Sequence, residues 1–139
     1  MTELLNENVR QILSDNIIGS LATVNEDGSP WVTPIHVFSD DEAVYWFSAQ
    51  APQHSQNIVR DGQASVALFS PDLTGGPKGV YVNGAATVLD VEDTTNAKKL
   101  IEAKIGKIPQ NFVEATAYRL AFGAVNSSKS SGNCWYFYS

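Results

Sequence analysis

The sequence contains a single cysteine, Cys134, in 139 residues. A lone thiol cannot form a disulfide within its own chain, so the cysteine usage does not indicate an oxidising compartment. The N-terminal residues lack the basic start and apolar core of a signal peptide. No apolar run approaches the roughly twenty residues that span a bilayer. We therefore expect a cytoplasmic protein that does not bind membranes.

Basic residues are scarce as well. Nine Lys and Arg against fifteen Asp and Glu give a net charge of −6, and no basic run occurs. Binding to a phosphate backbone needs a stripe of Lys and Arg that displaces counterions, so a nucleic-acid partner is not expected. A hydrophobic fraction of 43% and a charged fraction of 17% are typical of a globular chain, and residues 1–139 fit one domain.

The common catalytic motifs are also missing. The sequence contains no GxGxxG, P-loop, HExxH or nucleophile elbow. Its two histidines, His36 and His54, fall on separate predicted elements with no third ligand suggested, so no metal site is predicted. The sequence assigns no catalytic residue.

What the chain does contain is a series of short strand patterns separated by polar turns. The Asp27-Gly28 pair supplies the positive-φ residue of a tight hairpin. Helical spacing predicts short helices at residues 4–13, 50–60 and about 93–104. Strands are predicted at residues 17–24, 31–38, 43–48, 64–70, 79–89, 118–125 and 134–138. This order favours a mainly β fold, an antiparallel Greek-key barrel with helices at its ends, over a doubly wound parallel sheet.

The start of the second predicted helix has the features of an anion site. Free N–H groups and the positive end of the helix dipole lie there, and Pro52 suits the first turn because it lacks an N–H. His54, Ser55 and Asn57 add side-chain donors, with Arg60 one turn further on. The pattern suits a terminal phosphate, and it is also compatible with a polar helix start that faces water.

Aromatic residues are concentrated on the predicted strands. Consecutive rings at 45–47 and at 135–138 must point to both faces of their strands. A small barrel cannot bury all of them inside. One face of each strand therefore needs a cover, either a partner subunit or a flat ring ligand.

One ordered set of segments resembles a known family. Residues 18–37, Ile-Gly-Ser-Leu-Ala-Thr-Val-Asn-Glu-Asp-Gly-Ser-Pro-Trp-Val-Thr-Pro-Ile-His-Val, resemble the opening of the pyridoxamine 5′-phosphate oxidase-like FMN-binding split-barrel proteins. The segments 45–48, 54–58 and 79–84 continue the match in the same order. The resemblance covers about residues 13–89.

The resemblance implies a six- to seven-stranded split barrel and a homodimer with FMN at the subunit interface. In such proteins the return strand lines the isoalloxazine ring, and the end of the next strand approaches the ribityl chain and phosphate. The start of the following helix binds the phosphate, the partner contributes from a long strand, and a C-terminal aromatic covers the ring. The matching residues here are Val32, Thr33, Pro34, Ile35, Phe47, Ser48, Ala49, His54, Ser55, Asn57, Lys78, Gly79 and Trp135.

The implied activity is that of an FMN-dependent oxidoreductase acting on a small-molecule substrate or electron donor. Backbone N–H groups between Thr33 and Ile35 would bond the polar edge of the flavin. Two departures matter. Many relatives carry Lys or Arg where Gln53 and His54 stand, and the oxidase proper has a longer C-terminal segment bearing Arg and His. We therefore expect no oxidation of pyridoxamine phosphate.

Three alternatives remain open at this point. A flavin or haem carrier or sensor without turnover could use the same barrel, with His36 or His54 as a haem ligand. A deazaflavin cofactor could replace FMN, although its longer anionic tail calls for more basic residues. A dimerisation module without a cofactor is the third alternative.

Overall fold

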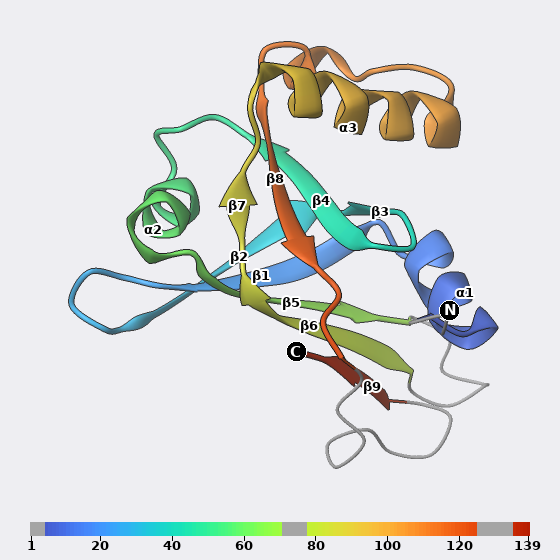
Figure 1. The fold of residues 1–139 in the computed structure, drawn as a ribbon, viewed down its shortest axis with the longest axis horizontal. Helices are drawn as coiled ribbons and strands as arrows, with labels where there is room; N and C mark the ends of the chain where they lie inside the picture. Colours follow the sequence, from blue (N-terminus) through green and yellow to red (C-terminus); the bar gives the residue numbers. More distant parts are fainter. Residues whose placement is uncertain (1–4, 71–77, 125–134) are drawn as a thin grey trace.

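The computed structural model describes residues 5–70, 78–124 and 135–139 (Figure 1). The predicted loop residues 71–77 and 126–132, Cys134 and the first residue of the predicted N-terminal helix lie outside these ranges. Within the described ranges there are three α-helices and a 3-10 turn: α1 Glu7–Asp15, α2 Gln53–Asp61, α3 Val91–Ile105 and η1 Gln110–Phe112. The strands are β1 Ile18–Val24, β2 Pro30–His36, β3 Phe38–Ser39, β4 Ala43–Ser48, β5 Gln63–Phe69, β6 Gly79–Ala85, β7 Thr87–Val88, β8 Thr116–Ala121 and β9 Trp135–Tyr138.

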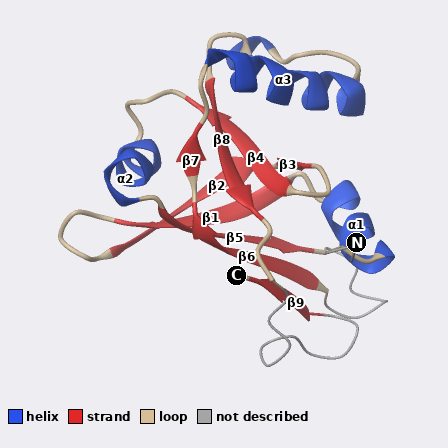
Figure 2. Cartoon of the chain, viewed as in Figure 1, coloured by secondary structure: helices blue, strands red, loops and turns tan. Residues whose placement is uncertain are grey.

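The strands form two sheets, of order β2-β1-β5-β6-β9 and β3-β4-β8-β7. The short helices lie around these sheets (Figure 2). Neighbouring strands are antiparallel, as predicted, except that β9 runs parallel to β6 with Gly79 opposite Trp135. The structure has more strands than the sequence predicted because two predicted strands each divide. The breaks fall at Val37 and Ala86, where the chain passes from one sheet to the other.

The helices begin and end for identifiable reasons. Asn6 caps α1 by accepting from the Val9 N–H, and Asp90 caps α3 by accepting from the Asp93 N–H. The sequence predicted this helix from about residue 93, and it begins earlier, at Val91. Gly62 ends α2 with a φ of 76°, and a Cβ there would lie 3.1 Å from the Ala86 carbonyl oxygen. Among the described residues, no helix combines the length and apolar character needed to cross a membrane.

Strand β4 contributes to two separate hydrophobic clusters. Trp46 is fully buried in the larger one, together with residues from α1 and the five-stranded sheet. Tyr45 and Phe47 point the other way, into a cluster that includes Ile101 of α3 and Phe112 of η1. The chain therefore covers both faces of β4 itself. The aromatic run at 45–47 does not need a partner or a ring ligand as its cover. The expectation of such a cover for this strand was wrong.

Candidate functional site

The start of α2 lies against the end of β4 and is polar. His54 Nε2 is 3.0 Å from Ser48 Oγ, and Ser55 Oγ donates to the Ala49 carbonyl over 2.7 Å. No side chain caps this helix, in contrast to α1 and α3. The first N–H groups of α2 are thus left for another acceptor, and they lie at the positive end of the helix dipole. This arrangement suits an anion.

His54 is the basic side chain closest to this helix start in sequence, and it is 8% exposed. Burial lowers the pKa of His54 below its usual value, because removal from water disfavours the imidazolium. The ring is therefore mainly neutral at pH 7. An anion at the α2 start would favour the protonated ring.

Asn57 lies one turn further along α2 and is fully buried. Its amide nitrogen donates to Thr23 Oγ1 (3.0 Å) and to Asn25 Oδ1 (2.9 Å). Its oxygen accepts from Gln53 Nε2 (2.9 Å) and from Arg60 Nη1 (3.0 Å). Both donor hydrogens of Asn57 are thus used within the protein. In this structure Asn57 attaches α2 to the β1–β2 hairpin.

Arg60 is held in the same network. Besides Asn57, it donates to the Val24 carbonyl and forms an ion pair with Asp61 at 3.1 Å. The positive charge that the sequence suggested for the anion site is therefore already partnered by an acidic side chain.

Replacing Asn57 by Ala should lower the free energy of unfolding by about 2–4 kcal/mol, because buried partners such as Thr23 lose their hydrogen bond. Urea denaturation measures this. Val59→Ala, at an exposed position of the same helix, is the matched control and should change stability by less than about 0.5 kcal/mol. An Asn57 variant as stable as this control would show that the network does not hold α2 in place.

The return strand β2 is an edge strand, paired only with β1 among the described residues. The hydrogen bonds from Val37 N to Ile17 O and from Asn25 N to Ser29 O lie at its two ends. They fix the alternation of the ladder, so the N–H groups of Thr33 and Ile35 point to β1. The N–H groups of Val32 and His36 point away from it. The expectation that N–H groups between Thr33 and Ile35 are available to a flavin edge was therefore wrong, because those of Thr33 and Ile35 point to β1 and Pro34 has none.

The side chains of β2 also alternate. Val32 and Pro34 lie opposite Ala22 and Ser20, on the face of the sheet turned away from the buried core. Thr33 and Ile35 are half-buried on the core side. Val32 is 67% exposed, which is unusual for a β-branched side chain in the middle of a strand.

The outer face of the five-stranded sheet carries no charged side chain among its described positions. The strand registers place a set of apolar and small polar residues on it. They are Ile18, Ser20, Ala22, Val24, Pro30, Val32, Pro34, His36, Gln63, Ser65, Ala67, Phe69, Gly79, Tyr81, Asn83, Ala85 and Phe137. Phe69 is 53% exposed, and Tyr81 and Phe137 stack with ring centroids 4.4 Å apart. A face this wide and uncharged is typical of a subunit interface.

The structure divides the predicted site residues into two groups. The first comprises those on β2, at the end of β4 and at the start of α2. The second comprises Lys78, Gly79 and Trp135. Gly79 pairs with Phe69, the last residue of β5, and with Trp135 of β9, the edge strand opposite β2. Seven residues of β5 span about 20 Å, and the edges β2 and β9 lie about 19 Å apart. One chain therefore does not bring the two groups together.

Among the predicted residues, Phe47 has its backbone and its side chain in different places. Its backbone leads to Ser48 and the α2 start, but its ring stacks on Phe112 at 5.5 Å in the cluster beneath α3. Ala49 is exposed beside the α2 start.

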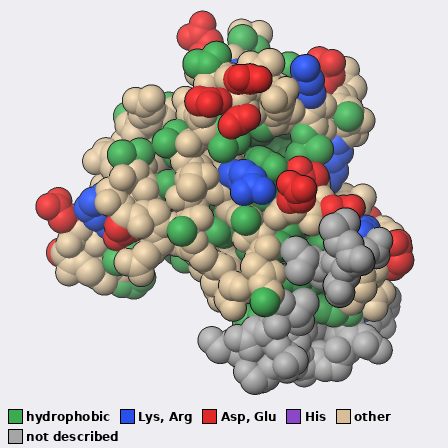
Figure 3. Space-filling model, viewed as in Figure 1, with side chains coloured by type: hydrophobic (Ala, Val, Ile, Leu, Met, Phe, Trp, Pro, Cys, Tyr) green, Lys and Arg blue, Asp and Glu red, His purple; other side chains and the backbone are tan. Residues whose placement is uncertain are grey.

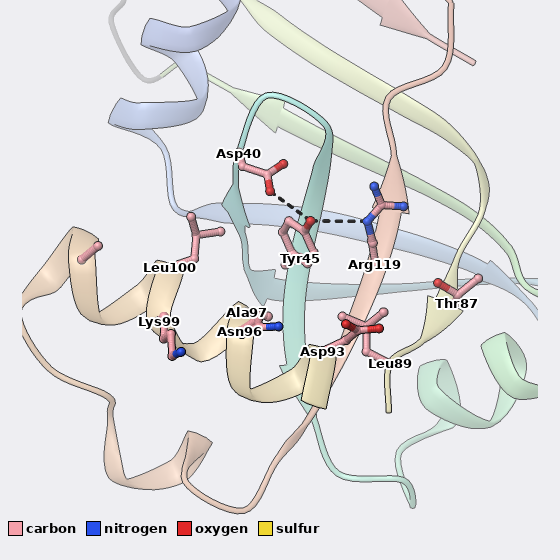
Figure 4. A pocket seen from close by; sticks show the side chains of 11 residues that line it. Asp40, Tyr45, Thr87, Leu89, Asp93, Asn96, Ala97, Lys99, Leu100 and Arg119 are labelled. Carbon is pink, nitrogen blue, oxygen red and sulfur yellow. Dashed lines mark hydrogen bonds between the residues drawn. The ribbon is translucent and has the colours of Figure 1, made fainter. Parts of the chain in front are cut away.

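Sequence reasoning missed a cavity of about 620 Å³ beneath α3 (Figure 4). It lies between α3 and strands β4, β7 and β8, and Tyr45 and Arg119 line it. Arg119 stands on β8 directly opposite Tyr45 of β4. Only the strand register shows this pairing, because the two residues are far apart in the sequence.

Comparison with protein families gives one match: the family described as pyridoxamine 5′-phosphate oxidase aligns with residues 5–128. No curated protein matched the sequence.

Several solved structures share the fold. A heme binding protein from Mycobacterium smegmatis is 20% identical with a TM-score of 0.68; the alignment covers 82% of this chain and 49% of that protein, so this chain spans about half its length. HutZ, a heme storage protein from Vibrio cholerae, is 18% identical with a TM-score of 0.70, covering 86% and 90% of the two chains. An F420 reductase is 19% identical with a TM-score of 0.65, covering 84% and 94%. At these identities the likeness shows a common fold.

Proposed function

The chain belongs to the pyridoxamine 5′-phosphate oxidase family, and on that premise we propose that it is an FMN-binding oxidoreductase that works as a homodimer on a small-molecule substrate. Closure of its two sheets into a split barrel of six to seven principal strands, and a location in the cytoplasm, are parts of the same proposal.

The observation that carries the proposal is the uncapped start of α2. The helix N–H groups there have no side-chain cap and lie beside the side chains of Ser48 and His54, and α2 in turn packs against β1 and β2. A terminal phosphate fits there, because the N–H groups and the Ser48 hydroxyl can donate to its oxygens. His54 adds a positive charge when a phosphate is next to it.

The outer face of the five-stranded sheet supports the proposed homodimer. A second copy stacked on this face would cover Val32 and Phe69, which are 67% and 53% exposed, without burying a charge from the described positions of the face. A twofold axis along the strands lays the β9 edge of one copy over the β2 edge of the other. Gly79 and Trp135 then approach the return strand across the interface, which unites the two groups of site residues.

In this arrangement the chain binds and orients the cofactor. Bound FMN supplies hydride or electron transfer. Val32 and Pro34 present an apolar surface to a flat ring, and the outward N–H groups of Val32 and His36 can donate to its polar edge. Ser48, Ala49, His54 and Ser55 form the phosphate end. Lys78 of the second copy adds a cation from across the interface.

The charge distribution favours FMN over a deazaflavin cofactor. The β1–β2 turn beside α2 carries Glu26 and Asp27, and Arg60 is already paired with Asp61. A long polyanionic tail would meet acidic side chains there and be repelled, whereas one phosphate needs only the α2 start.

Titration of the purified protein with FMN tests the proposal. We expect one FMN bound per chain and a shifted, structured visible spectrum. Riboflavin should bind at least about tenfold more weakly because it lacks the phosphate and its charge-assisted hydrogen bonds. Reduction of the bound flavin by NADH or NADPH, followed by its loss of visible absorbance, tests the redox role. A protein that takes up no FMN contradicts the proposal.

A haem carrier is the second candidate, and the exposure of His36 favours it. His36 ends β2, is exposed, and packs edge-on against Phe112 at 6.3 Å. His54, by contrast, is buried with Nε2 against Ser48. If haemin gives a Soret band that His36→Ala removes and His54→Ala keeps, while FMN does not bind, the haem carrier replaces the flavin proposal.

A further inference from the structure

The cavity beneath α3 is separate from the α2 start and from the outer face of the five-stranded sheet. It measures about 620 Å³, within the range of small-molecule sites. In the space-filling view, hydrophobic side chains gather below α3, with basic and acidic side chains at the border (Figure 3). In Figure 4, Asp40, Tyr45 and Arg119 lie in a row along one side of the cavity.

Two hydrogen bonds fix the position of Arg119. Its Nε donates to the Tyr45 hydroxyl over 3.3 Å, and that hydroxyl donates to Asp40 Oδ2 over 3.0 Å. Its guanidinium carbon is 6.0 Å from the centre of the Tyr45 ring. Burial raises the pKa of Tyr45, so the hydroxyl keeps the proton that it donates to Asp40.

The remaining donors of Arg119 are available. The side chain is 33% exposed, and its Nη2 is 3.8 Å from a carboxylate oxygen of Glu42, whose side chain is 80% exposed. That distance is too long for a hydrogen bond. Among the described residues no acceptor takes the four Nη hydrogens. A guanidinium two-thirds buried with a free fork is suited to bind a carboxylate through two parallel hydrogen bonds.

The Asp40 carboxylate accepts from other donors and is not bonded to the Arg119 fork. Its Oδ1 accepts from the N–H groups of Glu42 (2.8 Å) and Ala43 (2.9 Å), and its Oδ2 accepts from Tyr45. It serves as the anchor of the β3–β4 turn. The other charged lining residues, Asp93 and Lys99, are exposed on α3 and of opposite sign.

Besides the polar side chains of Thr87 and Asn96, the cavity has an apolar wall. Leu89, Ala97, Leu100 and Ala103 line it from the β7–α3 connection and from α3. A ligand body of carbon atoms fits against this wall while its charged end meets Arg119. We infer that the cavity binds a small organic monocarboxylate with an aromatic or aliphatic body, held by Arg119 at one end and by the α3 wall along its length.

Phenylacetate is the probe for this site, and the uncharged phenylacetamide is its matched control. Calorimetry and heteronuclear NMR of the whole chain should show saturable binding of phenylacetate, with shifts in α3 and β8. We expect phenylacetamide to bind at least about tenfold more weakly. Arg119→Gln should reduce the affinity for phenylacetate to the same degree, because it removes a charge-assisted pair. Lys107→Gln, which removes an exposed charge outside the cavity, should change it less than about twofold.

Ala103→Phe provides a second variant that does not touch the Tyr45–Arg119 contact. Ala103 is exposed on α3 and lines the cavity, so the larger ring fills the space without disturbing the buried core. It should abolish phenylacetate binding and leave FMN binding unchanged. Equal binding of the acid and the amide would overturn the inference. So would full affinity in either Arg119→Gln or Ala103→Phe. None of these outcomes bears on the flavin proposal, whose readout is the visible spectrum.

Discussion

Replacing Val32 by Asp is expected to convert the proposed dimer into monomers and to abolish FMN binding with it. Val32 lies near the middle of β2 on the outer face, 67% exposed in the single chain. A second copy stacked there would bury the new carboxylate in an apolar interface without a partner. An unpaired buried charge costs about 3 kcal/mol or more, which weakens the dimer at least about 100-fold. Because the interface is twofold, each copy contributes one such carboxylate.

Analytical ultracentrifugation across a concentration series measures the dimer, and an FMN titration measures the cofactor site. Val59→Asp is the matched control, since Val59 is 68% exposed but lies on α2, away from the sheet face. This control should stay dimeric. A Val32→Asp protein that remains dimeric places the interface elsewhere. A monomeric variant that still binds FMN tightly would show that one chain suffices for the site.

The local elements could be predicted because their signals are local. The Asp27-Gly28 turn, the alternation along β1 and the glycine that ends α2 are each decided by a few neighbouring residues. The divisions at Val37 and Ala86 could not be predicted in this way. A strand that passes between sheets keeps an apolar pattern across the break, and only its partners show that it has changed sheets.

The candidate site was only partly predictable for a related reason. The position of His54 followed from the polar helix start, which the structure leaves uncapped, whereas Ser48 was named only through the family resemblance. The role of Asn57 depends on Thr23 and Asn25, more than thirty residues away, and no local pattern reports such contacts. Arg119 was missed because an arginine on a strand normally faces solvent. Arg119 is suited to bind a ligand because the Tyr45 hydroxyl opposite fixes its position.

FMN affinity should rise about tenfold as the pH falls from 8 to about 6.5. The reason is that His54, the titratable side chain at the α2 start, takes up a proton when the phosphate binds. Burial lowers the pKa of His54 in the free protein, so the ring is neutral before the ligand binds. A phosphate beside it favours the imidazolium and raises the pKa in the complex. Proton uptake therefore accompanies binding, and binding tightens as protons become available. A charge-assisted hydrogen bond accounts for a factor of about ten.

The same pKa shift has the opposite consequence for the stability of the free protein. A histidine whose folded pKa lies below its unfolded value takes up more protons when unfolded. The free energy of unfolding should therefore decrease as the pH falls below about 6.5, and less so in His54→Gln.

Fluorescence titration with FMN between pH 8 and about 6.5 tests the predicted pH dependence of FMN binding. Riboflavin should show no pH dependence, and His54→Gln should remove it for FMN. Unchanged pH dependence in that variant would assign the proton to another group.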